Sequence, residues 1–527
     1  MITERTFLLK NQVNSGLTVL FATLCIIDIF GVFPIIALPH AIIQCGLLGI
    51  PLVMVVIFLQ IYTASLLGKS WIIATYLDPQ IARKNRYPLA AVTELTLGRK
   101  MRTLVTFLLD LTVFGCGIPN LLVASQNLQL FGLKVSNNQF DLSFCYWLLV
   151  VGVLLCPLMW LGSPRDMKSL ATCSTLAVIT TSILIWWGII TDDRTLETIP
   201  VPTAPTWDKF ISGYGMLAFQ FDVHPTLMTI QVDMKRPNDI NKAVVLSFLF
   251  SGLLFGVTAG LSAWKYQGSV TANILQISPP GLPSRAAILF SALQLIFSSV
   301  IGHAALFLHL EDQLHVRRTF GWKRCAMRSA VVFLGVAIGE SVPRFDIVMA
   351  LIGGTLTGPL VFILPPIMYA RAKRLKETIS NRIATPEIFS ATERRYGEDL
   401  VSDPRAHSQS IYYDLLSENE DNEEKSDDNN YNDNKLIIEQ NAEATTSFID
   451  ATQPEKLYKT KTTQSLIKVE VNRFNLFFEQ LMNWFGYFVV IIGILITISS
   501  TYINIKNTIK FVKFTPPCII NASAQMF

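Results

Sequence analysis

Apolar runs of about 20 residues recur along this chain, and they constrain its fold more than any other feature. A helix needs about 20 apolar residues to cross the hydrocarbon core of a bilayer. Inside lipid the backbone must satisfy its own hydrogen bonds, which a helix does within one segment. Strands of a membrane barrel would be shorter and would alternate apolar with polar residues, whereas these runs are continuous. The chain is therefore expected to be an all-α integral membrane protein.

The runs predict eleven transmembrane helices, ten in a dense block and one after a long polar segment. Only 16% of the 527 residues are charged, against about 25% in soluble domains. The charges gather in short loops and in one long segment. The predicted spans are 17–43, 46–68, 103–131, 143–162, 169–191, 207–231, 243–264, 284–310, 326–342, 345–370 and 484–504.

Lysine and arginine in the short loops predict the orientation, because cytoplasmic loops carry an excess of these residues. The loops around 69–102 and 311–328 are rich in them, whereas the loop that holds Lys134 is poor. The ten-helix block 17–370 is thus expected to begin and end on the cytoplasmic side. The expected parts around it are a cytoplasmic N-tail (1–16), a cytoplasmic acidic segment (371–483), an eleventh helix (484–504) and an extracytoplasmic C-tail (505–527).

Three segments outside the ten-helix block carry signals of their own. Residues 417–430 are dominated by Glu, Asp and Asn, a composition that buries no core and predicts disorder. We interpret the acidic segment as a solvated spacer, with a regulatory segment that carries phosphorylatable serines as the alternative. Asn521 opens a glycosylation sequon, which suits an extracytoplasmic C-tail. Residues 4–9 resemble an acidic dileucine sorting signal, so either the plasma membrane or an endolysosomal membrane is expected.

Two of the predicted spans are interrupted in the same way. The first contains Gly31 followed by Pro34 and Pro39, and the sixth contains Gly215 followed by Pro225. Proline removes a backbone donor and clashes with the preceding turn, while glycine adds conformational freedom. In one span alone this would indicate an ordinary kink. Two interrupted helices in corresponding positions instead indicate a transporter binding site near the bilayer midplane.

The two interrupted spans begin two halves of five helices each. Because five is odd, the second half starts from the opposite side of the membrane, which makes the halves an inverted repeat. Unwound backbone exposes amide and carbonyl groups, and these suit the carboxylate and ammonium groups of a zwitterion. The expected fold is therefore a five-plus-five inverted repeat with an eleventh transmembrane helix.

Three aspartates, Asp28, Asp110 and Asp222, lie inside apolar spans. A carboxylate in this position is costly and is therefore functional by default. Desolvation favours the neutral form of a carboxyl group, which would let such a group carry a proton. We expect Asp28 or Asp222 to be the carrier and His224 to relay protons, because imidazole titrates near neutral pH. The alternative for each is a neutral, hydrogen-bonded packing role.

Other sequence features predict neither a metal site nor an enzyme. His303 and His309 are six residues apart and do not share a helical face, so we interpret them as packing or cytoplasmic-end residues. The chain has no His-Glu-x-x-His motif, no glycine-flanked serine and no phosphate loop. No catalytic residue, cofactor or nucleic-acid partner is expected.

Gly252, Gly256 and Gly260 recur every four residues and predict a ridge for close helix packing.

The motifs around the interrupted spans resemble those of the amino acid/auxin permease family. This family includes proton-coupled amino acid transporters, sodium-coupled neutral amino acid transporters and the vesicular GABA transporter. The matching motifs cover 17–370 in the family's order. They are Ala37-Leu-Pro-His-Ala41 with Gly46 and Gly49, Tyr87-Pro88 with Leu97-Gly98, Ser163 to Ala171, Tyr214 to Pro225 with Gln231 to Pro237, and Glu311.

The resemblance implies the fold of the leucine transporter and secondary active transport of small neutral amino acids. It favours proton-coupled symport by alternating access around unwound helices one and six. A sodium-coupled transporter and an amino-acid-binding sensor that signals through its cytoplasmic segment are the alternatives. Pro34 and Asp222-Val223 replace family glycines, so the particular substrate does not carry over. The expected substrate-binding residues are Gly31, Val32, Phe33, Phe219, Phe221 and Asp222, and the expected ion-coupling residues are Asp28, Asp222 and His224.

Overall fold

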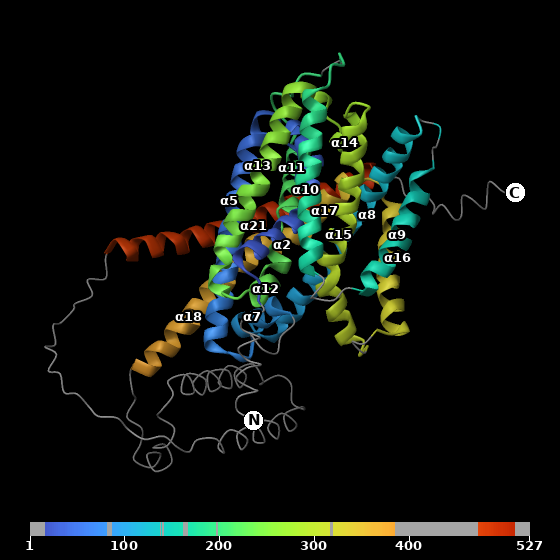
Figure 1. The fold of residues 1–527 in the computed structure, drawn as a ribbon. Helices are drawn as coiled ribbons and strands as arrows, with labels where there is room; N and C mark the ends of the chain where they lie inside the picture. Colours follow the sequence, from blue (N-terminus) through green and yellow to red (C-terminus); the bar gives the residue numbers. More distant parts are fainter. Residues whose placement is uncertain are drawn as a thin grey trace, which may run out of the picture. The chain divides into compact units, whose positions relative to one another are not determined.

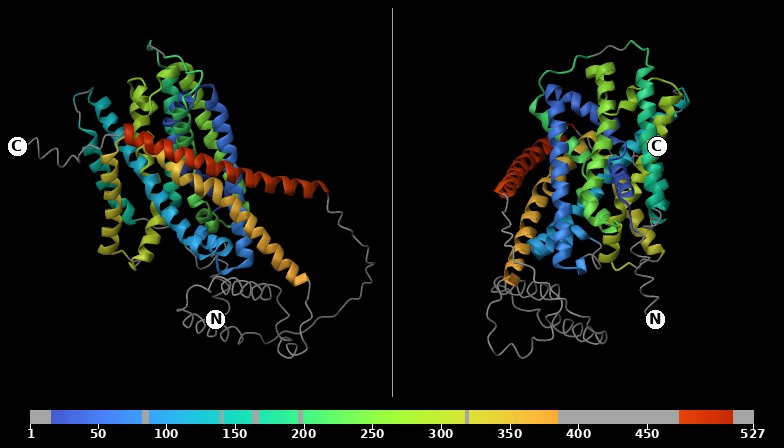
Figure 2. Two further views of the ribbon diagram at one scale, coloured as in Figure 1. Left: turned by 180° about the vertical axis from the view of Figure 1, so that it is seen from behind. Right: turned by 60° about the vertical axis from the view of Figure 1, so that its left-hand side comes forward.

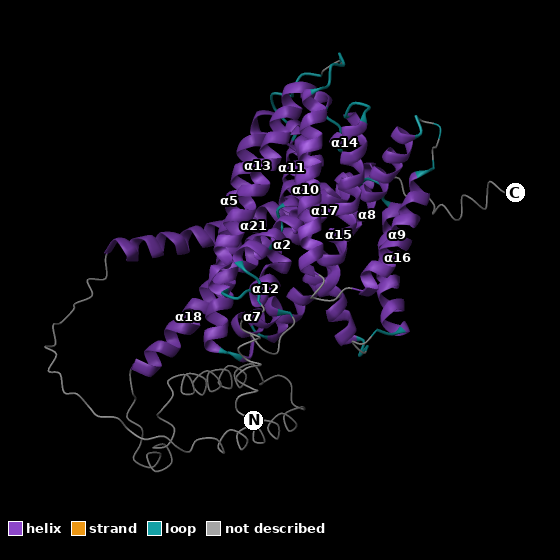
Figure 3. Ribbon diagram, viewed as in Figure 1, coloured by secondary structure: helices purple, strands orange, loops and turns teal. Residues whose placement is uncertain are grey.

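The computed structural model describes residues 16–81, 87–137, 139, 142–161, 167–195, 199–316, 320–384 and 473–511. Their regular secondary structure is helical (Figure 3), apart from one isolated parallel bridge between Leu17 and Met234. The dileucine-like residues, the acidic stretch and the sequon at Asn521 lie outside the described residues.

The chain divides into two compact units, Met1–Lys376 with Trp484–Phe527 and Glu377–Asn483. The second unit contributes only the end of helix α18 (Leu364–Ala384) and the start of helix α21 (Arg473–Phe511) to the described residues. All contacts below lie within the first unit. Its helices and those that continue from it are α2 (Val19–Phe30), α3 (Phe33–Ile36), α4 (Leu38–Gln44), η1 (Gly46–Leu48), α5 (Gly49–Leu77), α7 (Pro88–Leu97), α8 (Arg99–Val135), α9 (Phe144–Leu161), α10 (Met167–Ile190), α11 (Trp207–Gln220), α12 (His224–Asp233), η2 (Pro237–Asp239), α13 (Ile240–Tyr266), η3 (Gln267–Ser269), α14 (Ile274–Ile277), α15 (Leu282–Gln313), α16 (Trp322–Ser341), α17 (Phe345–Ile352), η4 (Gly353–Thr357), η5 (Pro359–Ile363), α18 (Leu364–Ala384) and α21 (Arg473–Phe511).

Seven helical segments in the described part of the chain are long and apolar enough to cross a membrane. They are Gly46–Leu77, Arg99–Val135, Ser169–Ile190, Pro237–Ser269, Leu282–Gln313, Phe345–Ser380 and Trp484–Lys510. Three shorter apolar helices, Val19–Phe30, Pro88–Leu97 and Phe144–Trp160, accompany them. The protein is therefore a multi-pass helical membrane protein. The count of eleven transmembrane helices and the inverted repeat stay predictions, because a span that is divided into short helices contains no single helix long enough to cross a membrane.

Both predicted helix breaks are present. Helix α2 ends at Phe30, and Gly31 adopts a φ of 61° before α3 begins. Helix α11 ends at Gln220, and α12 begins four residues later, at His224, with Pro225 in its first turn. Pro34 likewise lies in the first turn of α3. The prolines therefore start new helices, at positions where a missing N–H costs no helical hydrogen bond.

The long helices form a bundle that encloses the two breaks. Helices α5, α13, α10 and α15 run alongside one another in Figure 1, and α11 and α12 follow each other between them. Helix α15 packs against both α8 and α10, and α13 packs against α2. From Trp484 onward, α21 runs obliquely across one side of this bundle, where it is drawn in red (Figure 2). The breaks therefore lie among packed helices.

The predicted glycine ridge on α13 is wrong. Gly252 is half-buried, and Gly256 and Gly260 are exposed, in the described structure. A Cβ atom at any of them would meet no described atom within 4 Å. Spacing alone did not reveal which face of α13 meets its neighbours.

Candidate functional site

The first break carries a buried carboxyl group, Asp28, whose exposed fraction is 0%. Its Oδ1 atom accepts a hydrogen bond from Ser174 Oγ of α10, and Gln294 Nε2 of α15 lies 3.5 Å from the same atom. Ser298 Oγ of α15 donates to the Asp28 carbonyl oxygen over 3.0 Å. Asp28 Oδ2 has no hydrogen-bond partner among the described residues. Donors from two helices thus hold the carboxyl group and leave one oxygen available.

Gln294 also satisfies the backbone at the break itself. Its Oε1 atom accepts from the Val32 N–H over 3.2 Å, and its Nε2 atom lies 3.4 Å from the Asp28 carbonyl oxygen. A Cβ atom at Gly31 would come within 3.0 Å of the Gln294 amide. The glycine therefore supplies both the positive φ and the space for this side chain.

The second break centres on Asp222, whose side chain is 2% exposed. Its Oδ1 atom accepts from the His224 N–H and its Oδ2 atom from Thr357 Oγ1, each over 3.1 Å. His224 is completely buried, with Nε2 2.9 Å from Thr63 Oγ1 of α5 and Nδ1 3.5 Å from Asp222 Oδ1. The carboxyl group thus binds the first residue of α12 and links it to η4.

A cavity of about 80 Å³ lies between the two breaks. Because one water needs roughly 10–15 Å³ on such a measure, the cavity has room for several waters or a small solute. Residues of both breaks line it together with one face each of α8 and α15. They are Ile29, Phe30, Phe33, Val113, Cys116, Gly117, Asn120, Phe219, Gln220, Asp222, Pro225, Thr226, Ser298, Ser299, Gly302 and His303.

The structure brings together only part of the predicted substrate-binding set. Phe33, Phe219 and Asp222 line the cavity, whereas Gly31 and Val32 do not. Phe221 does not line it either.

Phe221 instead faces an aromatic cluster. It is completely buried, and its ring centroid lies 5.5 Å from that of Phe30, 5.9 Å from that of Phe248 and 6.2 Å from that of Phe255. Its ring therefore anchors the break to α13.

The two predicted ion-coupling aspartates occupy different places around the cavity. Asp222 lines it directly, while Asp28 lies behind its wall. Ser298 connects the two environments, because it lines the cavity and donates to the Asp28 carbonyl oxygen. His224 does not line the cavity and is enclosed between Asp222 and Thr63.

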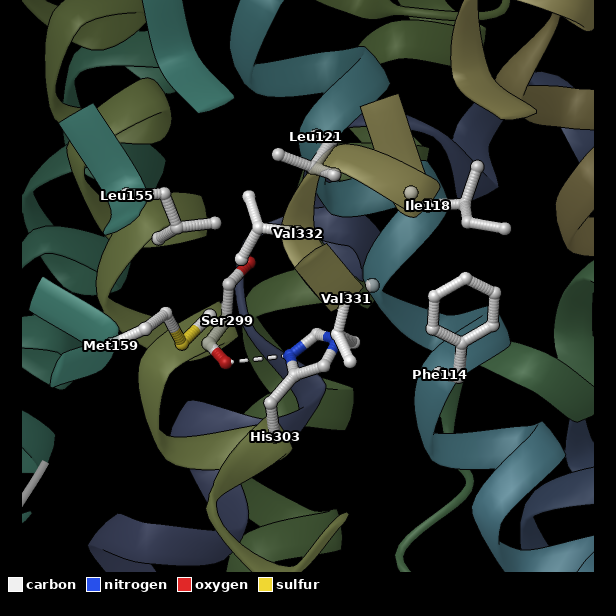
Figure 4. Close-up of a pocket in the computed structure, with 11 residues that line it drawn as sticks. Phe114, Ile118, Leu121, Leu155, Met159, Ser299, His303, Val331 and Val332 are labelled. Carbon is white, nitrogen blue, oxygen red and sulfur yellow. Dashed lines mark hydrogen bonds between the residues drawn. The ribbon is translucent and has the colours of Figure 1, made fainter. Parts of the chain in front are cut away.

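His303 was interpreted as a packing or cytoplasmic-end residue, yet it lines the cavity and an adjoining chamber of about 10 Å³ (Figure 4). A chamber of that size holds about one water. The His303 Nδ1 atom lies 2.7 Å from the Ser299 carbonyl oxygen, which can only accept, so Nδ1 carries the proton of the neutral ring. Gly117 provides the space for the imidazole, since a Cβ atom there would overlap it. The remaining walls of the chamber are mostly apolar: Phe114, Ile118, Leu121, Leu155, Met159, Val331 and Val332.

Asp110, the third intramembrane aspartate, lies away from the cavity. Its carboxyl oxygens are 2.8 Å from Tyr87 Oη and 2.8 Å from His309 Nδ1. The cluster ties α8 to α15 and to the residue that precedes α7. This geometry suits the packing alternative for Asp110.

The sequence alone did not identify Cys116, Asn120, Ser298 and Ser299 as cavity residues. All four come from α8 and α15, which carry no helix break at the cavity. Asn120 and the two serines are polar residues inside apolar spans, and that signal could have indicated them.

The family model described as transmembrane amino acid transporter protein matches residues 16–393. The match contains both helix breaks and every residue of the cavity. The chain belongs to this family. Its membership confirms the resemblance found in the sequence motifs.

Individual members of the transmembrane amino acid transporter family are distant from this chain. Amino acid transporter AVT1C of Arabidopsis thaliana is 23% identical over 364 residues, which are 65% of this chain and 62% of the relative. Amino acid transporter AVT1B of the same plant is 23% identical over 367 residues, 65% of this chain and 63% of the relative. Vacuolar amino acid transporter 3 of Schizosaccharomyces pombe is 22% identical over 198 residues, 36% of this chain and 29% of the relative. The chain thus spans less than two thirds of the length of these relatives.

Proposed function

We propose that this protein is a secondary active transporter of small neutral amino acids, driven by a proton gradient. The observation that carries the proposal is the cavity between the two helix breaks, with Asp222 in its wall. Interrupted helices in a transporter expose helix ends, which carry partial charges, to an otherwise apolar site, where these ends bind the polar groups of the substrate. Alternating access would expose this cavity first on one side of the membrane and then on the other.

The lining of the cavity favours a small zwitterion. Phe30, Phe33 and Phe219 supply apolar walls, while Asn120 and Ser299 supply polar groups. The carbonyl ends of α2 and α11 and the Asp222 carboxylate suit an ammonium group, because helix C-termini are negative. A cavity of about 80 Å³ leaves little room for a long side chain.

Asp28 is our proposed proton carrier. It is completely buried, and its Oδ2 atom lacks a partner in the described structure. A buried carboxylate oxygen without a partner is costly, and binding a proton there relieves the charge. A sodium ion would instead need several oxygen ligands, and at this break the oxygens of Asp28 and Ser298 could provide some of them.

We further propose that the protein resides in the plasma membrane or an endolysosomal membrane. The name of the Schizosaccharomyces pombe relative, a vacuolar transporter, favours the endolysosomal membrane. Imaging of the full chain against markers of both membranes tests this placement, and residence in a third membrane would contradict it.

Uptake into proteoliposomes tests the proposed activity. Purified protein would be assayed with radiolabelled alanine, glycine and proline under an inward proton gradient, an inward sodium gradient and no gradient. We expect concentrative uptake under the proton gradient alone. Uptake under the sodium gradient alone would show that sodium, and not the proton, is the coupling ion. Saturable binding without uptake under any gradient would contradict transport and favour the amino-acid sensor.

A further inference from the structure

The last helix of the described residues, α21, lies beyond the family match and packs against a π-helical segment of the bundle. Gly353–Thr357 and Pro359–Ile363 are π-helical. A Cβ atom at Gly354 would overlap Ser500 of α21, and one at Gly358 would overlap Thr497. Small residues that let helices approach closely are typical of contacts inside membranes, and π-helical turns occur often at functional sites.

Asn504 anchors α21 at the start of this segment. Its side chain is buried, and Nδ2 donates to the Ala350 carbonyl oxygen over 2.8 Å and to Ser500 Oγ over 3.0 Å. The Ala350 carbonyl lies one turn before the π-helical turns. Because an amide in an apolar span is costly unless it is hydrogen-bonded, this contact fixes α21 to the bundle.

The opposite side of the same segment reaches the candidate site. Thr357 Oγ1 donates to Asp222 Oδ2 over 3.1 Å at the second helix break. A Cβ atom at Gly215 of α11 would lie 2.5 Å from the Ala350 carbonyl oxygen. The Ala350 carbonyl is therefore located between α11, which leads into the break, and Asn504 of α21.

We propose that Asn504 is a positioning residue for the substrate site, acting through the π-helical segment on Thr357 and Asp222. This inference rests on the proposed function, in which Asp222 contacts the substrate. Under this proposal, α21 takes part in transport because its Asn504 helps to position the substrate site. Loss of the Asn504 amide would let the segment shift, and the Thr357 hydroxyl would then hold the Asp222 carboxyl group less firmly.

The first test compares alanine uptake by Asn504→Leu with that of the wild type. The variant keeps the branching and the number of heavy atoms of the side chain and removes its donor. We expect KM to rise about two- to tenfold, the range for one lost hydrogen bond, while kcat changes less. Thr357→Val should raise KM in the same way, and the double variant should be no worse than either single variant, because both changes break one chain of contacts.

Thr508→Val is the matched control. Thr508 Oγ1 donates to the Asn504 carbonyl oxygen within α21, so the variant also removes a hydroxyl without touching the π-helical segment. We expect its KM and kcat to match those of the wild type. If Asn504→Leu fails to fold, Ser500→Ala replaces it, because it removes the hydroxyl that orients the Asn504 amide. Wild-type KM in both Asn504→Leu and Ser500→Ala would overturn the proposal.

A second readout does not depend on transport. Cys116 lines the cavity, and its labelling by a methanethiosulfonate reagent requires the thiolate, so the rate reports how far water enters the cavity. Mass spectrometry of the Cys116 peptide would give this rate for each variant. We expect at least twofold faster labelling in Asn504→Leu and Thr357→Val and no change in Thr508→Val. Wild-type rates of Cys116 labelling in Asn504→Leu and Thr357→Val would overturn the inference. If the wild-type protein itself took up no alanine, that result would instead count against the proposed function.

Discussion

Replacing Asp28 by asparagine should uncouple transport from the proton gradient while leaving the site intact. The substitution keeps the size of the side chain and an Oδ1 acceptor for Ser174. The contacts of Ser298 and Gln294 with the main-chain oxygen of residue 28 are also unaffected. What is lost is the one group at the first break that can take up and release a proton. We therefore expect a folded variant that still binds and exchanges substrate.

The size of the effect follows from one proton per transport cycle. Asp28 has a single unpartnered carboxyl oxygen in the described structure, so it accepts one proton. A gradient of one pH unit supplies about 1.4 kcal/mol per proton, which corresponds to about tenfold accumulation of a symported solute. The wild type should therefore concentrate alanine up to about tenfold per pH unit at zero membrane potential. Asp28→Asn should equilibrate alanine without concentrating it.

Two assays on the same proteoliposomes separate coupling from binding. Steady-state accumulation under a proton gradient reports coupling, and exchange of external label against internal unlabelled alanine reports the site. Asp110→Asn is the matched control, because Asp110 is bound by Tyr87 and His309 away from the cavity. Accumulation by Asp28→Asn at the wild-type level, in protein with a wild-type melting temperature, would remove Asp28 from the coupling mechanism.

Three further predictions concern the cavity, the first break and a loop. His303→Ala joins the cavity to its side chamber and should lower KM for leucine relative to alanine at least threefold in competition uptake; an unchanged ratio would exclude His303 from substrate selection. Gly31→Ala places a Cβ atom at positive φ, which costs about 1–2 kcal/mol, and against the Gln294 amide, so its melting temperature should fall by several degrees; a wild-type value would refute the strain argument. Arg194→Gln removes hydrogen bonds that are the main reason why the pKa of Asp192 is lowered from 3.8 to about 2. A carboxyl group whose pKa is lowered by folding stabilises the folded protein at pH values above its ordinary pKa, and this stabilisation is lost as the pH falls through the lowered pKa. The variant should therefore melt at a lower temperature than the wild type at pH 7, and the difference should disappear toward pH 2.

The helix breaks could be predicted from the sequence because their causes are local. Gly31 takes a backbone conformation that other residues avoid, and Pro34 and Pro225 each lie in the first turn of a new helix. The burial of Asp28 and Asp222 also followed from their place in apolar runs. These signals require no knowledge of which helices become neighbours.

The rest of the site could not be predicted because it depends on packing between distant segments. Val32 binds Gln294, which is 262 positions away, and Phe221 turns toward α13 because helical periodicity stops at the break. Ser298 and His303 reach the cavity only through the packing of α15 against the broken helices. The same holds for Asn504, whose polar character in an apolar span was visible but whose partner on α17 was not.

The most direct test of the account asks whether an amino acid occupies the cavity between the two breaks. Cys116 lines that cavity, so a bound substrate should shield its thiol from a methanethiosulfonate reagent. Labelling of Cys116 in purified protein would be followed by mass spectrometry with and without saturating alanine, and Cys325, a partly exposed cysteine in the first turn of α16, would be the internal control. We predict that alanine slows labelling of Cys116 severalfold and leaves Cys325 unchanged. Equal labelling of Cys116 with and without alanine, in protein that takes up alanine, would contradict the assignment of this cavity as the substrate site.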